Sequence, residues 1–459
     1  MKTTGGRAAV LYLMAVAFLA GLGVFLYGFF TQGGAWAMQP YNKYATGDSQ
    51  LTNAGQVLDR NGVVLAKSEN GKRVYSADET VRRAMLHAVG DTNGYISTGV
   101  QYRYRSEIGG YNPFTGLTSP TGKKQGNDIR LTLSAELSKT AYQKLKNRRG
   151  AVAVYNYKTG EILTMVSTPG FDPSNVPKDI DTNSSYEGAY LNKVLSASYT
   201  PGSIFKLVTT VAAIENLPDW QTKQFECTGS VTINGNKITC DGKHGKIDIK
   251  EALAQSCNVA FAELAVELGA DKMNAAARQM GFNGALTVEG IPTSKSKYDA
   301  KGAEPQELAW SGIGQYTDMT NPYHMMLMMG AIANGGTPIQ PYFIKDIRAD
   351  FGLPVHQGKT ESAAAFLPPA TAETLKTLMR YNVTNNYGDK MFPGLSVCAK
   401  TGTAEVGGGK KPNGWIVGFS ADEKTPYAFA VVVEEGDYGR TSAGPIATAV
   451  MAKATELGL

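Results

Sequence analysis

The sequence predicts an α+β fold, in which an antiparallel sheet covered by helices follows a membrane-spanning helix and a small β-rich module. Three observations lead to this prediction. An uncharged apolar run opens the chain, strand patterns lie at both ends of the remaining sequence, and helical patterns lie between them. Strands at both ends with helices between them favour a single sheet that buries its faces against helices. We therefore expect a cytoplasmic tail and anchor over residues 1–37, a module over 38–127, and a helix-covered sheet with an all-helical subregion over 128–459.

The apolar run covers residues 8–30, AAVLYLMAVAFLAGLGVFLYGFF, and is long enough to span a bilayer as a helix. Lys2 and Arg7 precede it, and no acidic residue occurs before Asp48. Positive flanks stay in the cytoplasm, so residues 31–459 are expected outside it. The alternative is a signal peptide cleaved near AWA at 35–37. The run exceeds the usual 7–15 residues of a signal sequence, which favours an uncleaved, single-pass anchor.

Charge and cysteine content narrow the range of partners. The net charge of +5 is spread along the chain without a basic stripe, so we expect no nucleic-acid partner. Four cysteines are too few for a disulfide framework in an exported chain of this size. Cys227 and Cys240 flank a hairpin whose Asn234-Gly235 turn would pair Cys240 with Gly229, so a disulfide between them stays open. No Cys/His spacing is typical of zinc, and we expect no metal.

The module and the sheet follow in order along the chain. GQVLDRNGVVLAKS at 55–68 predicts two short strands around an Asn-Gly turn, and a capped helix is expected from Ser76. No combination of acid, base and nucleophile occurs in this module, which favours a spacer or docking role. Further strands are expected in 128–168, and a helix follows the first of them. Helices are then expected over 203–216, 249–269 and 320–334, strands over 395–403, 414–420 and 427–433, and a last helix at the end of the chain.

A candidate nucleophile lies at the start of the first of these central helices. Ser203 and Lys206 are three residues apart, so they share one helix face, and the helix is largely apolar. A serine needs a base, and none of the four histidines lies in a recognisable triad motif, which leaves Lys206. Two later stretches can complete such a site. They are Ser256 and Asn258 in AQSCNVAF, and Lys400, Thr401, Gly402 and Thr403 in CAKTGTAE.

Together and in this order, Ser-x-x-Lys, Ser-x-Asn and Lys-Thr-Gly match one known set of motifs. The chain resembles a class B penicillin-binding protein, a monofunctional D,D-transpeptidase of bacterial cell-wall synthesis. The similarity covers nearly the whole length and includes DRNGVVLA, GAVAVYNYKTGEILTMVSTPGFDPS, NKVLSASYTPGSIFKLVT and GIGQYTDMTNPYHMMLMMGAIANGG. The short N-terminal module is similar to that of the penicillin-binding protein A branch, where it serves as a pedestal or dimerisation-like region.

The resemblance implies a role for each motif residue. Ser203 would be acylated, Lys206 would be the general base, Ser256 would relay a proton and Asn258 would hold the substrate amide. Lys400 would help to keep Lys206 neutral. Thr401, Gly402 and Thr403 would bind the donor carboxylate, and the backbone N–H groups of Ser203 and Thr403 would form the oxyanion hole. No cofactor is implied.

The resemblance also implies substrates and partners. The donor would be a peptidoglycan stem peptide ending in D-Ala-D-Ala, and β-lactam antibiotics would acylate the same serine. About a hundred residues between anchor and catalytic domain are too few for an added glycosyltransferase domain, which argues against a bifunctional synthase. For a monofunctional transpeptidase the resemblance implies a separate partner that polymerises glycan, a SEDS-type membrane glycosyltransferase. One departure is Asn413-Gly414 before Trp415, where His-Ala is more usual.

Three alternatives share these motifs. A serine β-lactamase would need a base that activates water to release the acyl-enzyme, and one sequence does not exclude such a base. A β-lactam sensor would keep the anchor, and a catalytically idle scaffold for a glycan polymerase would keep the fold. The complete motif set argues against the scaffold.

Overall fold

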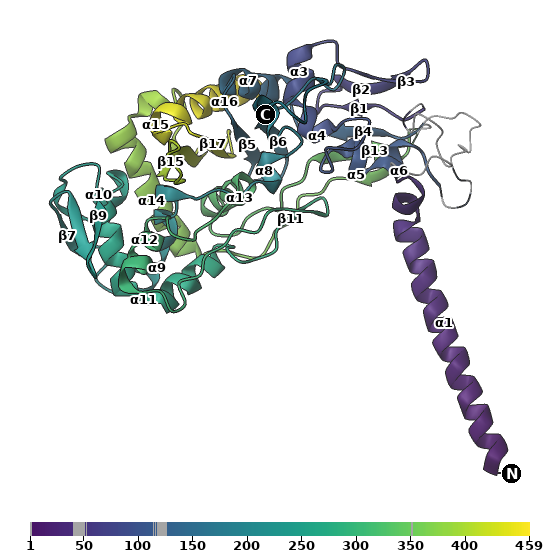
Figure 1. The fold of residues 1–459 in the computed structure, drawn as a ribbon, viewed down its shortest axis with the longest axis horizontal. Coiled ribbons are helices and arrows are strands. Elements are labelled where there is room, and N and C mark those ends of the chain that lie inside the picture. Colours follow the sequence, from purple (N-terminus) through teal and green to yellow (C-terminus); the bar gives the residue numbers. More distant parts are fainter. Residues whose placement is uncertain are drawn as a thin grey trace.

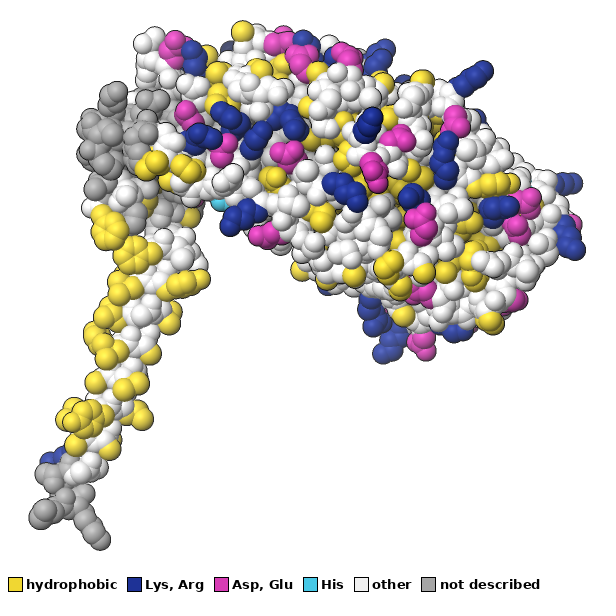
Figure 2. Space-filling model, turned by 180° about the vertical axis from the view of Figure 1, so that it is seen from behind, with side chains coloured by type: hydrophobic (Ala, Val, Ile, Leu, Met, Phe, Trp, Pro, Cys, Tyr) yellow, Lys and Arg dark blue, Asp and Glu magenta, His cyan; other side chains and the backbone are white. Residues whose placement is uncertain are grey.

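The computed structural model describes residues 2–39, 51, 53–112, 114, 116, 126–349 and 352–459. It is an elongated body from which α1 (Lys2–Ala37) projects at one end (Figure 1). Residues 5–37 of α1 are long and apolar enough to cross a membrane, and their most apolar window has no buried residue. Figure 2 shows hydrophobic side chains along α1, whereas both signs of charge are interspersed on the visible face of the body. The sequence-predicted anchor is therefore a helix with the length and exposed apolar surface that a bilayer requires.

A six-stranded sheet lies at the end of the body nearest α1 (Figure 1). Its strand order is β14-β13-β4-β1-β2-β3, so strands from distant parts of the chain share it. The strands are β1 (Val57–Leu58), β2 (Val64–Glu69), β3 (Lys72–Tyr75), β4 (Asp128–Leu131), β13 (Ile344–Arg348) and β14 (Pro354–Gln357). Short helices cover it: α3 (Glu79–Ala84), α4 (Leu86–Val89), α5 (Val100–Arg103) and α6 (Arg105–Ile108). The described part of the N-terminal module thus shares a sheet with segments that follow residue 127.

A five-stranded antiparallel sheet forms the centre of the body. Its order is β15-β16-β17-β5-β6, which brings the last strands of the chain beside strands of the first half, as expected. The strands are β5 (Gly150–Asn156), β6 (Ile162–Thr168), β15 (Val397–Ala404), β16 (Asn413–Ser420) and β17 (Tyr427–Val433). Since successive side chains on a strand face opposite sides, Val152 packs with α7 (Ala135–Leu145) and α16 (Gly444–Glu456), and Ala153 packs in the core that contains α13 (Pro322–Ala333).

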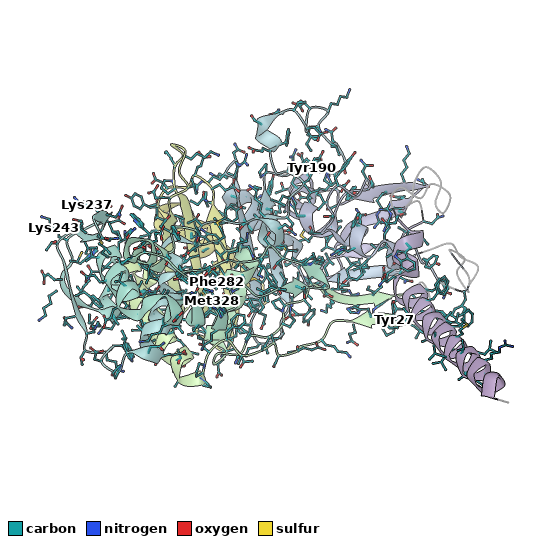
Figure 3. All side chains as sticks on the ribbon, turned by 60° about the horizontal axis from the view of Figure 1, so that its bottom comes forward. Tyr27, Tyr190, Lys237, Lys243, Phe282 and Met328 are labelled. Carbon is teal, nitrogen blue, oxygen red and sulfur yellow. The ribbon has the colours of Figure 1, made fainter. Side chains whose placement is uncertain are left out.

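Helices and small hairpins make up the other end of the body, farthest from α1 (Figure 1). The helical elements there are η2 (Gly202–Ile204), α9 (Lys206–Asn216), α10 (Ile249–Ala254), α11 (Asn258–Gln279), α12 (Pro305–Gly312) and α14 (Pro369–Asn382). Two further short helices pack against the five-stranded sheet instead, α8 (Lys193–Ser196) against β5 and β6, and α15 (Gly439–Ser442) against β16. The strands at the outer end are β7 (Gln224–Cys227), β8 (Ser230–Ile233), β9 (Asn236–Thr239) and β10 (Gly245–Asp248). In Figure 3, Lys237 and Lys243 lie at this outer end, Tyr27 lies on α1 at the opposite end, and Phe282 and Met328 lie within the body.

Short elements complete the described chain. They are β11 (Thr287–Val288), β12 (Ile291–Pro292), η1 (Ser184–Tyr186), η3 (Val383–Tyr387) and η4 (Asp389–Met391).

Two of the predicted helices start or continue differently from expectation. The helix predicted over 203–216 begins with the 3-10 turn η2, because Gly202 adopts a left-handed φ of 57°. The helix predicted over 249–269 is broken between α10 and α11, because Ser256 adopts a left-handed φ of 56°. A left-handed non-glycine residue cannot continue a right-handed helix. The first change lies next to Ser203, and the second lies at Ser256 of the Ser-x-Asn motif.

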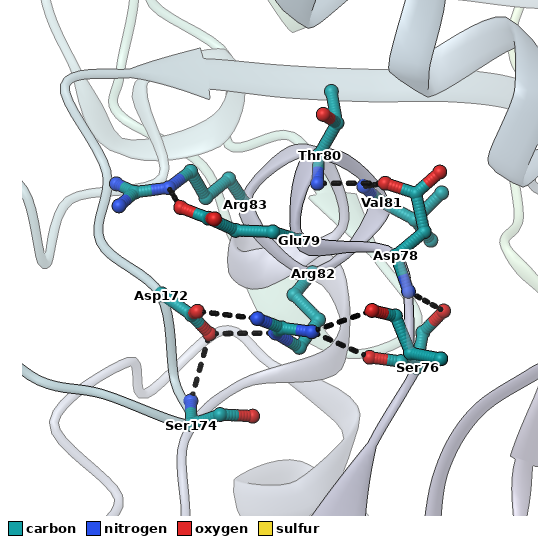
Figure 4. Close-up of polar contacts among 10 residues, drawn as sticks. Ser76, Asp78, Glu79, Thr80, Val81, Arg82, Arg83, Asp172 and Ser174 are labelled. Carbon is teal, nitrogen blue, oxygen red and sulfur yellow. Dashed lines mark hydrogen bonds and ion pairs between the residues drawn. The ribbon is translucent and has the colours of Figure 1, made fainter.

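A partly buried ion pair ties the N-terminal module to the central region (Figure 4). The guanidinium of Arg82 on α3 donates two hydrogen bonds to the carboxylate of Asp172, at 2.8 and 2.6 Å. The third guanidinium nitrogen, Nη1, donates to the carbonyls of Ser76 and Ala77. A fork-to-fork pair of this kind fixes direction as well as distance. The module therefore has a defined orientation relative to the loop that follows β6.

The hairpin of β8 and β9 has the register that the Asn234-Gly235 turn predicts. The amide of Cys240 donates to the carbonyl of Gly229 at 2.9 Å, which confirms the expected pairing. All four cysteines lie in the described part of the chain, and each is a free thiol. The disulfide that the sequence left open is therefore not formed in this structure.

Candidate active site

The three motifs meet at one cleft between the helical region and the edge of the five-stranded sheet. Ser203 comes from η2, and Thr401–Thr403 come from edge strand β15. Ser256 lies in the break between α10 and α11, and Asn258 is the first residue of α11. The cleft has a volume of about 340 Å³. Every motif residue except the buried Lys206 and Lys400 lines its wall, so Ser203, the candidate nucleophile, faces a space that can admit a small molecule or peptide end.

Lys206 is fully buried behind Ser203 and contacts four oxygen atoms. Its Nζ lies 3.1 Å from Ser203 Oγ, 2.6 Å from the Ser256 carbonyl oxygen and 2.7 Å from Asn258 Oδ1. A neutral amine has two N–H donors and one lone pair. The carbonyl and the amide oxygen accept the two N–H groups, which leaves the lone pair for the hydroxyl proton of Ser203. The contacts of Lys206 therefore fit a base that is ready to receive this proton.

Ser256 links the two lysines of the site. Its Oγ lies 3.2 Å from Lys206 Nζ and accepts from Lys400 Nζ at 2.9 Å. Lys400 also donates to the carbonyl of Thr401 at 2.9 Å. The left-handed backbone of Ser256 directs the hydroxyl between the two amines, at a cost of roughly 1–2 kcal/mol for a non-glycine residue. The arrangement gives a proton a path between the two amines through one hydroxyl.

Burial changes the protonation of both lysines. It lowers the pKa of Lys206 to about 8 and outweighs the nearby acidic groups, which raise it. It lowers the pKa of Lys400 well below its ordinary value, and the charge of Lys206 lowers it further. Because each ammonium repels the other, the pair favours a state in which only one amine is charged. A neutral base is therefore accessible near neutral pH.

The Lys-Thr-Gly strand has a free edge on the side of the cleft that Ser203 also lines. The amide of Thr401 donates to Tyr387 Oη at 3.0 Å, away from β16. Backbone N–H groups alternate in direction along a strand, so the Thr403 amide points to the same free edge. Gly202 lies against the Thr403 carbonyl, where an added Cβ would be 2.3 Å from the oxygen. This contact needs glycine and brings the first turn of η2 against the strand edge.

The structure adds residues that the motifs did not predict. Tyr387 on η3 contacts both the amide and the hydroxyl of Thr401, and Arg440 on α15 lines the cleft and donates to the Tyr387 carbonyl. No local spacing pattern marks them, because they come from separate segments that meet only in the folded chain.

The unusual Asn413-Gly414 pair has a local steric reason. A Cβ on Gly414 would lie 2.1 Å from Ser442 Oγ. Asn413 Oδ1 accepts from the amide of Glu435 at 3.1 Å. The departure from His-Ala therefore concerns packing beside α15.

Comparison with known proteins agrees with this geometry. Residues 150–452 match the family model described as the penicillin binding protein transpeptidase domain. The chain is 26% identical to the peptidoglycan D,D-transpeptidase PbpA of Mycolicibacterium smegmatis, over 91% of each chain. It is 27% identical to the stage V sporulation protein D of Bacillus subtilis, over 88% of this chain and 68% of that protein.

Solved structures show the same fold. The D,D-transpeptidase domain of a peptidoglycan glycosyltransferase from Eggerthella lenta superposes with a TM-score of 0.76 and 26% identity, over 88% of this chain and 98% of that chain. A penicillin-binding protein A acyl-enzyme from M. tuberculosis superposes with a TM-score of 0.78 and 23% identity, over 88% and 99%. The family match spans more than half of the sequence, and the chain belongs to the penicillin-binding protein transpeptidase family.

Proposed function

We propose that this chain is a peptidoglycan D,D-transpeptidase in which Ser203 is the acylated nucleophile and Lys206 the general base. The observation that carries the proposal is the contact set of Lys206, whose Nζ lies 3.1 Å from Ser203 Oγ while its two N–H groups have other acceptors. A serine hydroxyl is a weak nucleophile until a base removes its proton. The chemistry of the site is therefore acyl transfer through an ester.

The reaction proceeds in two halves. Ser203 Oγ bonds to the carbonyl carbon of the penultimate D-Ala while its proton passes to Lys206. The peptide C–N bond then breaks, and the leaving D-Ala amine takes a proton through Ser256, which contacts both Lys206 and Lys400. An amine of a neighbouring stem peptide attacks the ester, loses a proton to the same network and returns Ser203 as a hydroxyl. The product is a cross-link.

Backbone and side-chain groups around Ser203 complete the site. The Ser203 amide, at the start of the helical segment, and the Thr403 amide, on the free strand edge, would bind the oxyanion. The hydroxyls of Thr401 and Thr403 and the backbone of Gly402 would hold the donor carboxylate. Asn258 Nδ2 donates to the Thr239 carbonyl, so its amide is held in place where it would contact the substrate.

Mass spectrometry after incubation with penicillin tests this assignment. We expect one stable adduct on Ser203, none in Ser203→Ala, and an unchanged adduct in the exposed control Ser198→Ala. With stem peptides ending in D-Ala-D-Ala and an acceptor amine, the wild type should release D-Ala and form a cross-linked product. Labelling at another residue, or rapid release of hydrolysed drug, would contradict the transpeptidase assignment and favour a β-lactamase.

The membrane arrangement is a second part of the proposal. We infer that residues 8–30 span the bacterial cell membrane once, with Lys2 and Arg7 in the cytoplasm and residues 31–459 outside. The exposed apolar surface of α1 and the charge asymmetry of its flanks support this orientation. It would place the cleft in the compartment that contains peptidoglycan.

The division of the chain suggests where a partner binds. We propose 1–37 as tail and anchor, 38–127 as a docking module, and 128–459 as the transpeptidase domain, with β4, β13 and β14 extending the sheet of the module. The partner we propose is a SEDS-type glycosyltransferase, which would contact α1 and the module. These lie at the same end of the body, so one membrane-embedded protein could reach both (Figure 1).

A further inference from the structure

Three thiols and one imidazole gather beside the active-site cleft, outside the proposed reaction. They are Cys227 at the end of β7, Cys240 after β9, His244 before β10 and Cys257 at the start of α11. Their ligand atoms all lie within 4.8 Å of one another. Cys227 and Cys257 are buried, and Cys240 and His244 are half-buried. The first three belong to the hairpin region at the outer end of the body, near the labelled Lys237 and Lys243 (Figure 3).

We propose that Cys227, Cys240, His244 and Cys257 bind a structural Zn²⁺ ion. Tetrahedral zinc with three sulfurs at about 2.3 Å and one nitrogen at about 2.0 Å separates two sulfurs by about 3.8 Å, and a sulfur and the nitrogen by about 3.5 Å. Cys240 Sγ and Cys257 Sγ are 3.9 Å apart. His244 Nδ1 is 3.5 Å from both Cys227 Sγ and Cys240 Sγ. These three separations are those of a closed tetrahedral Cys₃His site, and the remaining pairs lie within 4.8 Å.

Backbone amides support thiolate character at two of the sulfurs. The amide of Asn258 donates to Cys240 Sγ at 3.2 Å, and the amide of Ala260 donates to Cys257 Sγ at 3.5 Å. Such bonds around a metal site hold the ligands in position and spread their negative charge. Binding replaces each S–H bond with an S–Zn bond and releases the proton to solvent.

A disulfide explains the cluster less well than zinc. Bonded sulfurs are about 2.0 Å apart, and one bond between any two cysteines would leave a third thiol and the imidazole without a role. Zinc uses all four groups at their present spacing. The sequence-based expectation of no metal overlooked that three of the four cysteines lie within residues 227–257 together with one histidine.

The site would fix two residues of the proposed reaction. Cys257 lies between Ser256 and Asn258, and the Asn258 amide donates directly to Cys240 Sγ. The side chain of Asn258 also donates to the carbonyl of Thr239, next to Cys240. The four ligands are therefore positioning residues, which hold the strained Ser256 backbone and the Asn258 side chain toward Lys206. This second part of the inference rests on the proposed function, whereas zinc binding does not.

Metal analysis of the purified full-length chain tests the zinc site directly. We expect about one zinc per chain, and at least a fivefold lower content in Cys240→Ser. Cys398→Ser removes a buried thiol outside the cluster, and His356→Asn removes an exposed imidazole, so both should keep the metal. Replacement of zinc by Co²⁺ in the wild type should give thiolate charge-transfer bands and the intense visible bands of a tetrahedral site, a readout that does not depend on any variant folding.

Two results would overturn the site. One is a wild-type chain without zinc after equilibration with micromolar Zn²⁺ in the presence of a thiol reductant. The other is a zinc content that Cys240→Ser leaves unchanged. The alternative is tested on chain that is purified without reductant, contains no zinc and is then denatured. Fewer than four titratable thiols in that sample would show that a disulfide forms in place of the metal site.

A separate measurement tests the link to the reaction. Removal of zinc by a chelator should slow penicillin acylation of Ser203 at least fivefold, and restored zinc should recover the rate. An unchanged rate would overturn the positioning role and leave the zinc site standing. Failure of the wild-type chain to be acylated would contradict the proposed function and leave the metal stoichiometry unaffected.

Discussion

Replacement of Lys206 by arginine tests whether the site needs a side chain that can lose its proton or only a positive charge at this position. Burial lowers the pKa of Lys206 to about 8, so about a quarter of the amine is neutral at pH 7.5. Arginine has a pKa above about 12, and its neutral fraction at pH 7.5 is below about 10⁻⁴. The substitution keeps a cation in the site and removes nearly all of the base.

The expected loss follows from these fractions. They differ by at least about 10³, and a positioned general base contributes roughly 10²–10⁴ to a rate. We therefore expect the second-order rate constant for acylation by penicillin to fall by about 10²–10⁴ in Lys206→Arg. Lys206→Met lacks both the charge and the base and should show a similar loss. It serves as the second variant if arginine does not fit the buried site.

A fluorescent penicillin provides the assay, with rates followed between pH 6.5 and 9. Acylation by the wild type should rise with pH through about 8, because the proposed base can accept a proton only in its neutral form and burial lowers the pKa of Lys206 to about 8. Lys193→Arg is the matched control, since Lys193 is also a buried lysine but pairs with Glu434 and does not line the cleft. It should stay within threefold of wild type. A folded Lys206→Arg variant that retains more than a tenth of the wild-type rate would show that another group is the base.

Three further predictions concern the turn at Ser203, acid stability and the anchor. Gly202→Ala should slow acylation at least tenfold, because the new Cβ meets the Thr403 carbonyl. Gly235→Ala is the control, since Gly235 also has a positive φ but a Cβ there lies in open space. Equal acylation rates in the two variants would contradict the prediction. Burial lowers the pKa of His324 to about 4, so stability is lost as pH falls from about 6.5 toward 4. In urea unfolding, protonation of this imidazole should lower the free energy of unfolding by about 2 kcal/mol between pH 7.5 and 5. His324→Asn should reduce that loss, and an identical pH dependence in the variant would refute the prediction. A chain beginning at Met38 and exported by a cleavable signal should still bind penicillin. It should fail to replace the full-length protein in cells, because tethering raises the effective concentration at the membrane. Full rescue by this chain would contradict the proposed partner contact.

Local patterns in the sequence were sufficient for the elements and the motif residues. The apolar run of residues 8–30, the short apolar run of residues 427–433 and the Asn234-Gly235 turn each depend on neighbours a few residues apart. Their predictions are confirmed by α1, β17 and the Cys240–Gly229 pairing. The Ser-x-x-Lys, Ser-x-Asn and Lys-Thr-Gly motifs could be found in the same way, because each is short and contiguous.

Breaks in local pattern were harder to predict. Residues 249–269 have helical periodicity on both sides of Ser256, so the sequence favoured one helix. The left-handed Ser256 costs energy locally and is held by contacts with Lys206 and Lys400, which lie 50 or more residues away in the chain. No window of neighbouring residues contains these partners.

The sequence by itself determined the apolar N-terminal helix, most strands and the three motifs to which we assign the chemistry, because apolar runs, turn residues and short motifs act over a few positions. The tertiary structure decided what those residues meet. It placed Lys206 between Ser203, Ser256 and Asn258, brought Tyr387 to Thr401, and added β13 to the sheet of the N-terminal module. It also closed Cys227, Cys240, His244 and Cys257 into one cluster. These contacts arise from packing between distant segments, which only the complete folded chain specifies.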